Sequence, residues 1–485
     1  MIHVLRLDRL FQRVLRRFSS DSSRWSQCKT VRDLLQSVQH VHHMDEAELR
    51  HLEAHSRNLL TGNLRDAAML SLMLHNFGGN VDSLLTSIKV STSSPDLDIY
   101  FRATAECGIE KPSVSLQDIL DTPGAVTSAR ELYNFFCGAC LFSQRGVLMP
   151  LESLVERVYN LGFEQFSSLQ LLQMAGCIAL FEDDRYRALV VSLCDELSNR
   201  KLHDVVFGDL IDGLSKLCRH YQSDILFPKF IEYMGAYSAD SMLSPSEMSA
   251  VLYILSRYRK GDPILMDRLS INLRRDIGNY DLIQISRVVV YVSQIGYYNR
   301  ALVSLLGRMV LTLIDCNSIV DPSVLTNLYT GFSRFLHNKG LFDLFSSILR
   351  KEEVFADLAL HDAVSIVQSY ARVHVIDDRL FRLFDAKLFT QPLNTTLSYK
   401  LLVAHGKLRY FNPRLHNLLV NNINLQEVVS DIDREKLKLA AERLGLFFPE
   451  LVDSGIDSAI PRITWRRMTP IRKKLGHVRR RKWTW

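Results

Sequence analysis

The chain has 485 residues, of which 47% are hydrophobic and 23% charged, and its formal net charge is +6. This balance excludes a disordered chain and predicts a folded protein. The longest apolar runs are short or carry a charge, so we expect no integral membrane span. Eight cysteines are scattered along the chain, which is typical of free thiols in a reducing compartment.

Residues 1–18 differ from the rest of the chain. They hold one acid, Asp8, and five arginines, and their apolar residues recur at three- and four-residue steps. An amphipathic, arginine-rich helix that leads into Ser19 and Ser20 predicts a transit peptide and import into the mitochondrial matrix. The alternative is a basic surface helix or a membrane-surface anchor.

Residues 19–100 read as an irregular N-terminal helical cap region. Histidines cluster there, at His40, His42, His43, His51 and His55. His51 and His55 stand one helical turn apart and could chelate a metal ion, but no third ligand is evident. We interpret them as a polar helix face and expect no metal site and no cofactor.

The most informative stretch, residues 207–419, repeats one helical pattern six times. A small residue anchors each copy, and the successive steps between anchors are 41, 37, 40, 38 and 35 residues. Apolar residues at fixed offsets from each anchor form a stripe of period 3.6, which predicts an amphipathic helix. The six anchors are Ser215, Ser256, Ser293, Ser333, Ala371 and Gly406.

A second helix is predicted after each of the last five anchors. Nine residues past the anchor stands Leu265, Leu302, Phe342, Leu380 or Leu415, and thirteen past stands Leu269, Leu306, Ser346, Phe384 or Leu419. Capping residues followed by proline mark helix starts at Ser244, Asp262, Asp321 and Asn412. At Ser346, the neighbouring Phe345 is expected to take the apolar place.

Weaker copies extend the pattern in both directions, with anchors at Ala105, Cys140, Cys177 and Ala441. We therefore expect an all-α fold, a right-handed α-solenoid of helix-pair repeats of about 35–41 residues over residues 101–455. Cys137 and Cys140 form a lone C-x-x-C within this array. Such a pair can serve zinc or redox chemistry, but its apolar surroundings favour simple packing.

The residue after each of the six anchors is a cation or an amide. Equivalent helices of a repeat protein stack about 8–10 Å apart, so these side chains would form a ladder able to follow a phosphate backbone. The alternative is that each one meets the dipole at the C-terminus of its own helix. The ladder consists of Lys216, Arg257, Gln294, Arg334, Arg372 and Lys407.

The remaining positive charge lies in a basic C-terminal tail, residues 456–485. Residues 462–485 carry a net charge of +10 and residues 1–18 carry +4. Because the whole chain carries +6, the body between these two segments carries −8. Basic and aromatic side chains together predict RNA binding through phosphates and stacked bases, and a membrane surface or an acidic protein is the alternative partner. The predicted RNA contacts are Arg466, Arg467, Arg472, Lys473, Lys474, Arg479, Arg480, Arg481, Lys482 and Trp483.

No motif of a phosphate loop, a nucleophile turn or a dinucleotide-binding fingerprint occurs in the sequence. We therefore predict that the protein is not an enzyme.

The repeat resembles the heptatricopeptide/octotricopeptide class, best seen in the segment Leu401-Leu-Val-Ala-His-Gly-Lys-Leu-Arg-Tyr-Phe-Asn-Pro-Arg-Leu415. Such arrays occur in the FAST-kinase-like and RAP-domain families of organellar RNA-binding proteins. The resemblance covers residues 207–444 and, more weakly, residues 100–206. It implies an organellar RNA-binding protein. No segment resembling a RAP domain follows the repeats, which favours an assembled, non-catalytic role.

Together these features predict a structural component of the mitochondrial ribosome that binds ribosomal RNA through its basic tail, with other ribonucleoprotein or mitoribosomal proteins as partners. A second hypothesis is a free RNA-processing or stability factor that binds single strands along its repeats. A third is a protein–protein scaffold that binds no RNA.

Overall fold

The computed structural model describes residues 28–446, with short gaps at 39–40, 42–43, 45, 60–62, 83–84, 86–87, 89, 123, 125, 182, 203–204, 241, 315–319, 336–338 and 429. Every regular element in this part of the chain is a helix, and no strand occurs in it. The predicted all-α class is confirmed. The predicted transit peptide and the basic tail lie outside the described residues.

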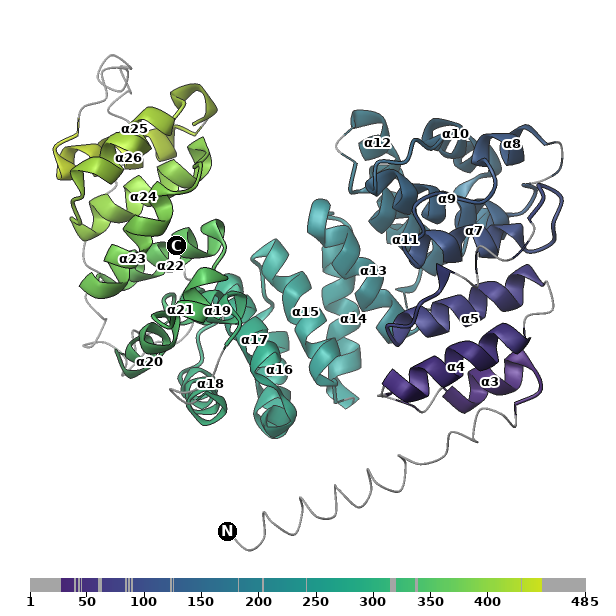
Figure 1. Cartoon of the computed structure of the whole chain (residues 1–485), viewed down its shortest axis with the longest axis horizontal. Coiled ribbons are helices and arrows are strands. Elements are labelled where there is room, and N and C mark those ends of the chain that lie inside the picture. The colour runs from purple at the N-terminus through teal and green to yellow at the C-terminus, as the bar shows by residue number, and fades with distance from the viewer. Residues whose placement is uncertain are drawn as a thin grey trace, which may run out of the picture. The chain divides into compact units, whose positions relative to one another are not determined.

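The chain divides into two compact units, residues 1–229 and residues 230–485, and helix α14 (Leu226–Asp240) runs through the division. The helices of the first unit are α3 (Val31–Val38), α4 (Glu46–Leu59), α5 (Leu64–Asn76), α7 (Leu97–Glu106), α8 (Leu116–Asp121), α9 (Ala129–Gln144), α10 (Leu151–Leu161), α11 (Ser168–Ile178), α12 (Asp184–Asn199) and α13 (Phe207–His220). Alternate helices pack in series, α5 on α7, α7 on α9, α9 on α11 and α11 on α13 (Figure 1).

The second unit repeats this arrangement. Its helices are α15 (Pro245–Tyr258), α16 (Pro263–Asp276), α17 (Leu282–Ile295), α18 (Arg300–Leu313), α19 (Pro322–Phe332), α20 (Lys339–Leu349), α21 (Glu352–Ala356), α22 (Leu360–Val373), α23 (Asp378–Phe389), α24 (Thr395–Leu408), α25 (Pro413–Asn422) and α26 (Asp431–Leu444). The first helices of the pairs, α15, α17, α19, α22, α24 and α26, pack on one another in that order (Figure 1).

The predicted helix starts are confirmed. The side chains of Ser244, Asp262, Asp321 and Asn412 each accept a hydrogen bond from a backbone amide in the first turn of α15, α16, α19 or α25, and a proline opens each of these helices. Such a cap satisfies one of the amides that a helix start leaves without a partner, and typically stabilises the helix by about 1 kcal/mol.

Close approach of consecutive first helices explains the small anchors. A Cβ added to Gly406 on α24 would lie 2.6 Å from Ala440 Cα on α26, so no larger residue fits without moving a backbone. The serine anchors hydrogen-bond within their own helix, as Ser256 Oγ donates to the Tyr253 carbonyl and Ser293 Oγ to the Val290 carbonyl, each at 2.7 Å. A small side chain that satisfies its own hydroxyl can therefore be buried at this contact.

The predicted second helices are also present. Leu265, Leu302, Phe342, Leu380 and Leu415 lie on α16, α18, α20, α23 and α25, and all five are buried. The short helix α21 and three 3-10 turns at Phe163–Gln165, Ile277–Asn279 and Leu425–Glu427 were not predicted. Within the described residues, no helix combines the length and the apolar character needed to cross a bilayer.

Candidate nucleic-acid interface

The C-terminal ends of three first helices in the second unit carry basic residues in an unusual backbone conformation. Arg259, His374 and Arg409 directly follow α15, α22 and α24, and their φ angles are 50°, 55° and 57°. The left-handed conformation favours glycine, which occupies the same place after α17 as Gly296, with φ of 78°. Basic side chains thus stand where the backbone alone would favour glycine.

The structure separates the six residues of the predicted ladder. Lys216 belongs to the first unit, and its ammonium pairs with Asp212 one turn earlier at 2.7 Å. Arg257 is exposed on α15, and the uncharged Gln294 is partly exposed on α17. The other three residues, Arg334, Arg372 and Lys407, are half-buried at the ends of α19, α22 and α24.

These three cations influence one another. Burial lowers the pKa of Arg372 to about 10, and the nearby Arg334 contributes to the shift. Burial likewise lowers the pKa of Lys407, with a further contribution from Arg372. The pKa of Arg334 is lowered by burial and then by Arg259. We name Arg259, Arg334, Arg372 and Lys407 the cation row.

Serine hydroxyls orient the central arginine of the row. Arg372 Nη1 donates to Ser333 Oγ at 3.2 Å and to Ser369 Oγ at 3.4 Å. Ser333 is the anchor of the preceding repeat, so this bond joins the ends of α19 and α22. The guanidinium is therefore held in place before any ligand binds.

The charges of the three half-buried cations are not balanced within the described part of the chain. No carboxylate of the described residues forms an ion pair with Arg334, Arg372 or Lys407. Two unit charges about 9 Å apart repel one another by roughly 2 kcal/mol at an effective dielectric constant of 20. The dipole of one helix stabilises an exposed cation at its C-terminus by only about 0.3–1 kcal/mol. The helix dipoles therefore do not offset the repulsion between neighbouring cations of the row, whereas a row of bound phosphates would.

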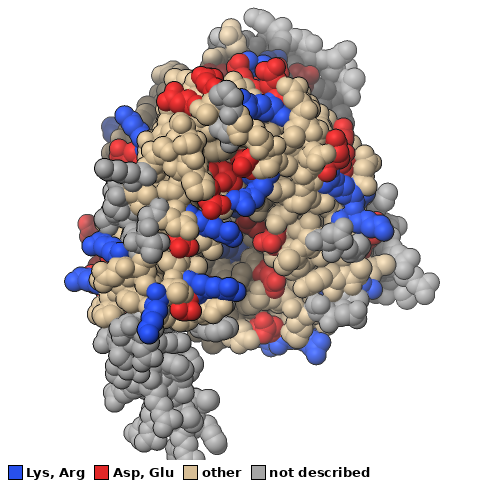
Figure 2. Space-filling model, turned by 90° about the vertical axis from the view of Figure 1, so that its right-hand side faces the viewer, with Lys and Arg blue, Asp and Glu red and all other residues tan. Residues whose placement is uncertain are grey.

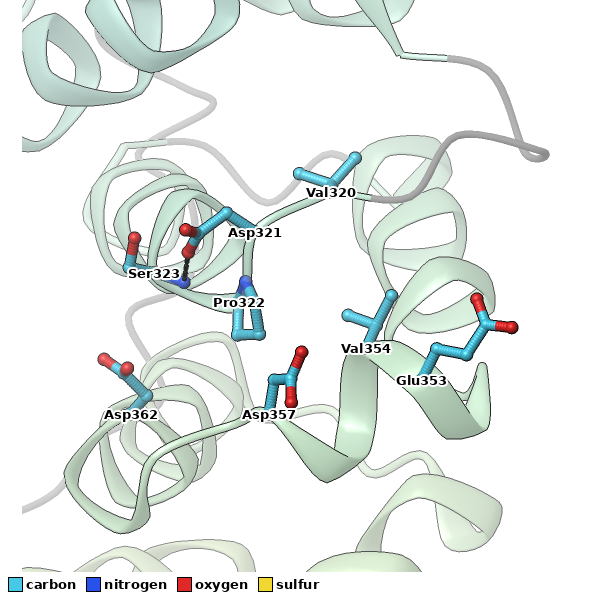
Figure 3. A pocket seen from close by; sticks show the side chains of 8 residues that line it. All are labelled: Val320, Asp321, Pro322, Ser323, Glu353, Val354, Asp357 and Asp362. Atoms are coloured by element: carbon cyan, nitrogen blue, oxygen red, sulfur yellow. Dashed lines mark hydrogen bonds between the residues drawn. The ribbon is translucent and has the colours of Figure 1, made fainter.

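The opposite ends of two of these first helices, α19 and α22, are acidic. A depression of about 370 Å³ lies at the starts of α19 and α22 and is lined by Asp321, Glu353, Asp357 and Asp362, together with Val320, Pro322, Ser323 and Val354 (Figure 3). Hydrogen bonds from Ser323 hold the pKa of Asp321 below its usual range, whereas burial raises the pKa of Asp362. An anionic ligand is thus repelled at one end of these helices and attracted at the other.

Another surface of the molecule mixes basic and acidic side chains, instead of separating them as the two ends of α19 and α22 do (Figure 2). On the face drawn in Figure 2, which is the right-hand side of Figure 1, lysines and arginines alternate with aspartates and glutamates. Several of the pairs in the first unit are direct, such as Arg185 with Glu152 at 2.5 Å and Arg130 with Asp96 at 2.9 Å. Paired surface charges of this kind do not attract a polyanion.

The two described histidines of the predicted cluster, His51 and His55, do not converge on a common ligand position. His55 Nε2 donates to the backbone carbonyl of Cys28 at 2.9 Å, while His51 is exposed on the same helix, α4. His40, His42 and His43 lie outside the described residues. In the described ranges, no three histidine, cysteine, aspartate or glutamate side chains are grouped so as to hold a metal ion.

The predicted ladder contains three members of the cation row but not Arg259. Its members are the residues directly after each anchor, whereas Arg259, His374 and Arg409 each stand three residues after an anchor. The recurrence of a basic residue three positions after an anchor is the sequence signal that could have identified Arg259. The ten predicted contacts of the tail lie outside the described residues.

No protein-family model matches the sequence. A comparison with curated proteins likewise finds no match. The resemblance to heptatricopeptide/octotricopeptide arrays therefore depends on the residues of the repeat alone.

Proposed function

We propose that this protein is a non-catalytic RNA-binding protein of the mitochondrial matrix, built as a right-handed α-solenoid of the heptatricopeptide/octotricopeptide type. The cation row carries the RNA part of the proposal. Three of its cations are half-buried without carboxylate partners among the described residues, and two serines orient one of them, Arg372. Such cations suit the phosphates of a nucleic-acid backbone.

The serial packing of first helices supports the solenoid. In each unit, every first helix contacts the next one along the chain. A row of equivalent side chains along such an array meets consecutive phosphates of an extended strand. The basic tail then adds sequence-independent contacts, and its tryptophans stack on unpaired bases.

The assembly we propose is the mitochondrial ribosome, with ribosomal RNA and other mitoribosomal proteins as partners. Its basis is the combination of an arginine-rich leader, an acidic body and a strongly basic end. The cation row favours a second candidate, a free RNA-processing or stability factor, because the row lies on the repeats and not on the tail.

Sedimentation of the tagged protein through a sucrose gradient distinguishes these functions. The ribosomal assignment predicts comigration with ribosomal RNA that survives moderate salt. A light peak that disappears after RNase treatment would instead support the free factor. Complexes that resist RNase and contain no RNA would reject both and leave a protein–protein scaffold.

A further inference from the structure

Two cysteines on neighbouring helices of the first unit lie side by side. Tyr133 Oη on α9 donates to Gln173 Oε1 on α11, which fixes how these two packed helices are aligned. Cys137 and Cys177 stand one turn further along α9 and α11, and the two thiols interact. Cys137 is buried, whereas Cys177 is partly exposed, and both are free thiols. The sequence motif pairs Cys137 with Cys140, but its partner in space is Cys177, 40 residues further along the chain.

A guanidinium lies beside this pair. Arg102 on α7 is fixed by Glu106 at 2.6 Å and by Asn134 Oδ1 at 3.3 Å, and it lies over the ring of Tyr133 with 4.8 Å between Cζ and the ring centre. Asn134 is held in turn by Asp98 at 2.7 Å. Three consecutive first helices, α7, α9 and α11, thus place a rigid cation next to two thiols.

The electrostatics differ between the two sulfurs. The hydrogen bond from Cys137 lowers the pKa of the Cys177 thiol, and the charges of Arg102 and Lys216 lower it further against the effect of burial. The same hydrogen bond and burial raise the pKa of Cys137 well above its usual value. Cys177 is therefore the more acidic of the two thiols, and it is the one that loses a proton first.

We propose that Cys177 and Cys137 form a peroxide-responsive dithiol, in which Cys177 reacts with a hydroperoxide and Cys137 then closes a disulfide between α11 and α9. A partly exposed thiol of lowered pKa, with a second thiol on the packed neighbouring helix and a cation nearby, is the arrangement that such chemistry needs.

Each step balances. The Cys177 thiolate attacks one oxygen of the hydroperoxide, so that an S–O bond forms and the O–O bond breaks. The leaving oxygen takes a proton from water, and the sulfur, having lost two electrons, becomes a sulfenic acid. The sulfur of Cys137 then attacks Cys177, an S–S bond forms, and the S–O bond breaks. The departing hydroxide leaves as water with the proton of Cys137. A dithiol reductant restores both thiols with two electrons and two protons.

The test treats the reduced, full-length protein with stoichiometric hydrogen peroxide at pH 7 and maps its cysteines by mass spectrometry without reduction. We expect a Cys137–Cys177 disulfide that dithiothreitol reverses. Cys28 is an internal reference, because it is also partly exposed and is hydrogen-bonded only to the hydroxyl of Ser37, at 3.5 Å, among the described side chains. Oxidation of Cys177 no faster than that of Cys28 would overturn the proposal, as would a Cys140–Cys177 disulfide or the absence of any cross-link.

Variants assign the two roles. In Cys137→Ser we expect Cys177 to accumulate as a sulfenic acid that dimedone traps, whereas Cys140→Ser, on the same helix, should form the disulfide as the parent does.

Arg102→Gln should slow oxidation of Cys177 on the order of tenfold, and Arg187→Gln, at an exposed position of α12, should leave it unchanged. Each variant is first checked for native helicity by circular dichroism. If a folded Arg102→Gln protein oxidises Cys177 at an unchanged rate, the arginine plays no part in the reaction. If Cys177 still forms an intramolecular disulfide in Cys137→Ser, Cys137 is not its partner.

Discussion

The imidazoles of His405 on α24 and His416 on α25 face one another in the core of the second unit, with 3.0 Å between His405 Nδ1 and His416 Nε2. Both side chains are buried. Burial lowers the pKa of His405 to about 3, with a contribution from His416, and lowers the pKa of His416 to about 4. Both rings are therefore neutral in the folded protein at pH 7, and one donates to the other.

This pair predicts sensitivity to acid. The pKa of histidine in the unfolded chain is 6.5, so between about pH 6.5 and 4 the unfolded chain binds more protons than the folded one. The free energy of unfolding is therefore highest above pH 6.5 and falls as the pH falls toward 4. We expect a loss of roughly 2 kcal/mol per histidine between pH 7 and pH 5, measured by urea denaturation followed by circular dichroism.

A single substitution isolates the effect. His416→Gln keeps a hydrogen-bonding side chain opposite His405 and removes one titrating group, so the loss between pH 7 and pH 5 should fall by about half. His51→Gln, at an exposed position of α4, is the control and should retain the full loss. Equal losses in the two variants would show that the buried pair does not set the acid response.

A second prediction concerns three hydroxyls that meet between α19, α20 and α22. Tyr329 Oη lies 3.1 Å from Ser346 Oγ and 3.2 Å from Tyr370 Oη, and Ser346 Oγ also donates to the Phe342 carbonyl at 2.7 Å. All three side chains are buried. Tyr370→Phe removes one member and leaves Tyr329 with one partner fewer, and we expect it to lower the free energy of unfolding by about 1–2 kcal/mol.

Combined substitutions test whether the three hydroxyls act as a unit. The triple variant Tyr329→Phe, Ser346→Ala, Tyr370→Phe leaves none of these hydroxyls without a partner, so it should cost less than the sum of the three single variants in urea denaturation. Strictly additive losses would indicate that the hydroxyls contribute independently.

A third prediction follows from the approach of α24 to α26. Gly406→Ala would place its Cβ 2.6 Å from Ala440 Cα, and because the obstacle is backbone we expect a destabilisation of about 1–3 kcal/mol. The control is Gly235→Ala on α14, where an added Cβ meets nothing within 4 Å and should stabilise by up to about 1 kcal/mol. A tolerated alanine at Gly406, measured by thermal denaturation, would contradict the packing explanation for the small anchors.

The helical repeat could be predicted because it depends on features that are local in the sequence. Apolar spacing, small anchors such as Ser256, and cap–proline pairs such as Asp262 with Pro263 each specify a helix or its start within a few residues. The short helix α21 has neither signal and was missed. Ser346 is a polar residue at an otherwise apolar position of the pattern, because its hydroxyl hydrogen-bonds Tyr329 and Tyr370 on other helices. The sequence of α20 alone does not indicate these partners.

The candidate sites depended more on tertiary structure. The ladder offset located Arg334, Arg372 and Lys407, but only the structure showed that Lys216 is ion-paired with Asp212 and that Arg259 joins the row. Similarly, the sequence paired Cys137 with Cys140, whereas packing of α9 on α11 brings Cys177 to it. Partners 40 residues apart along the chain follow from the packing of repeats, which spacing within one repeat does not reveal.

The salt dependence of RNA binding tests the central claim most directly. The triple variant Arg334→Gln, Arg372→Gln, Lys407→Gln is compared with the control Arg379→Gln, Arg382→Gln, Lys400→Gln, whose cations are exposed on α23 and α24. Both are measured with single-stranded RNA, with and without residues 462–485, so that the tail does not mask the repeats. We predict that the slope of log K against log salt becomes shallower by about 2 in the first variant, for three lost phosphate contacts, and is nearly unchanged in the control. Equal slopes in the two variants would contradict a role of the cation row in RNA binding.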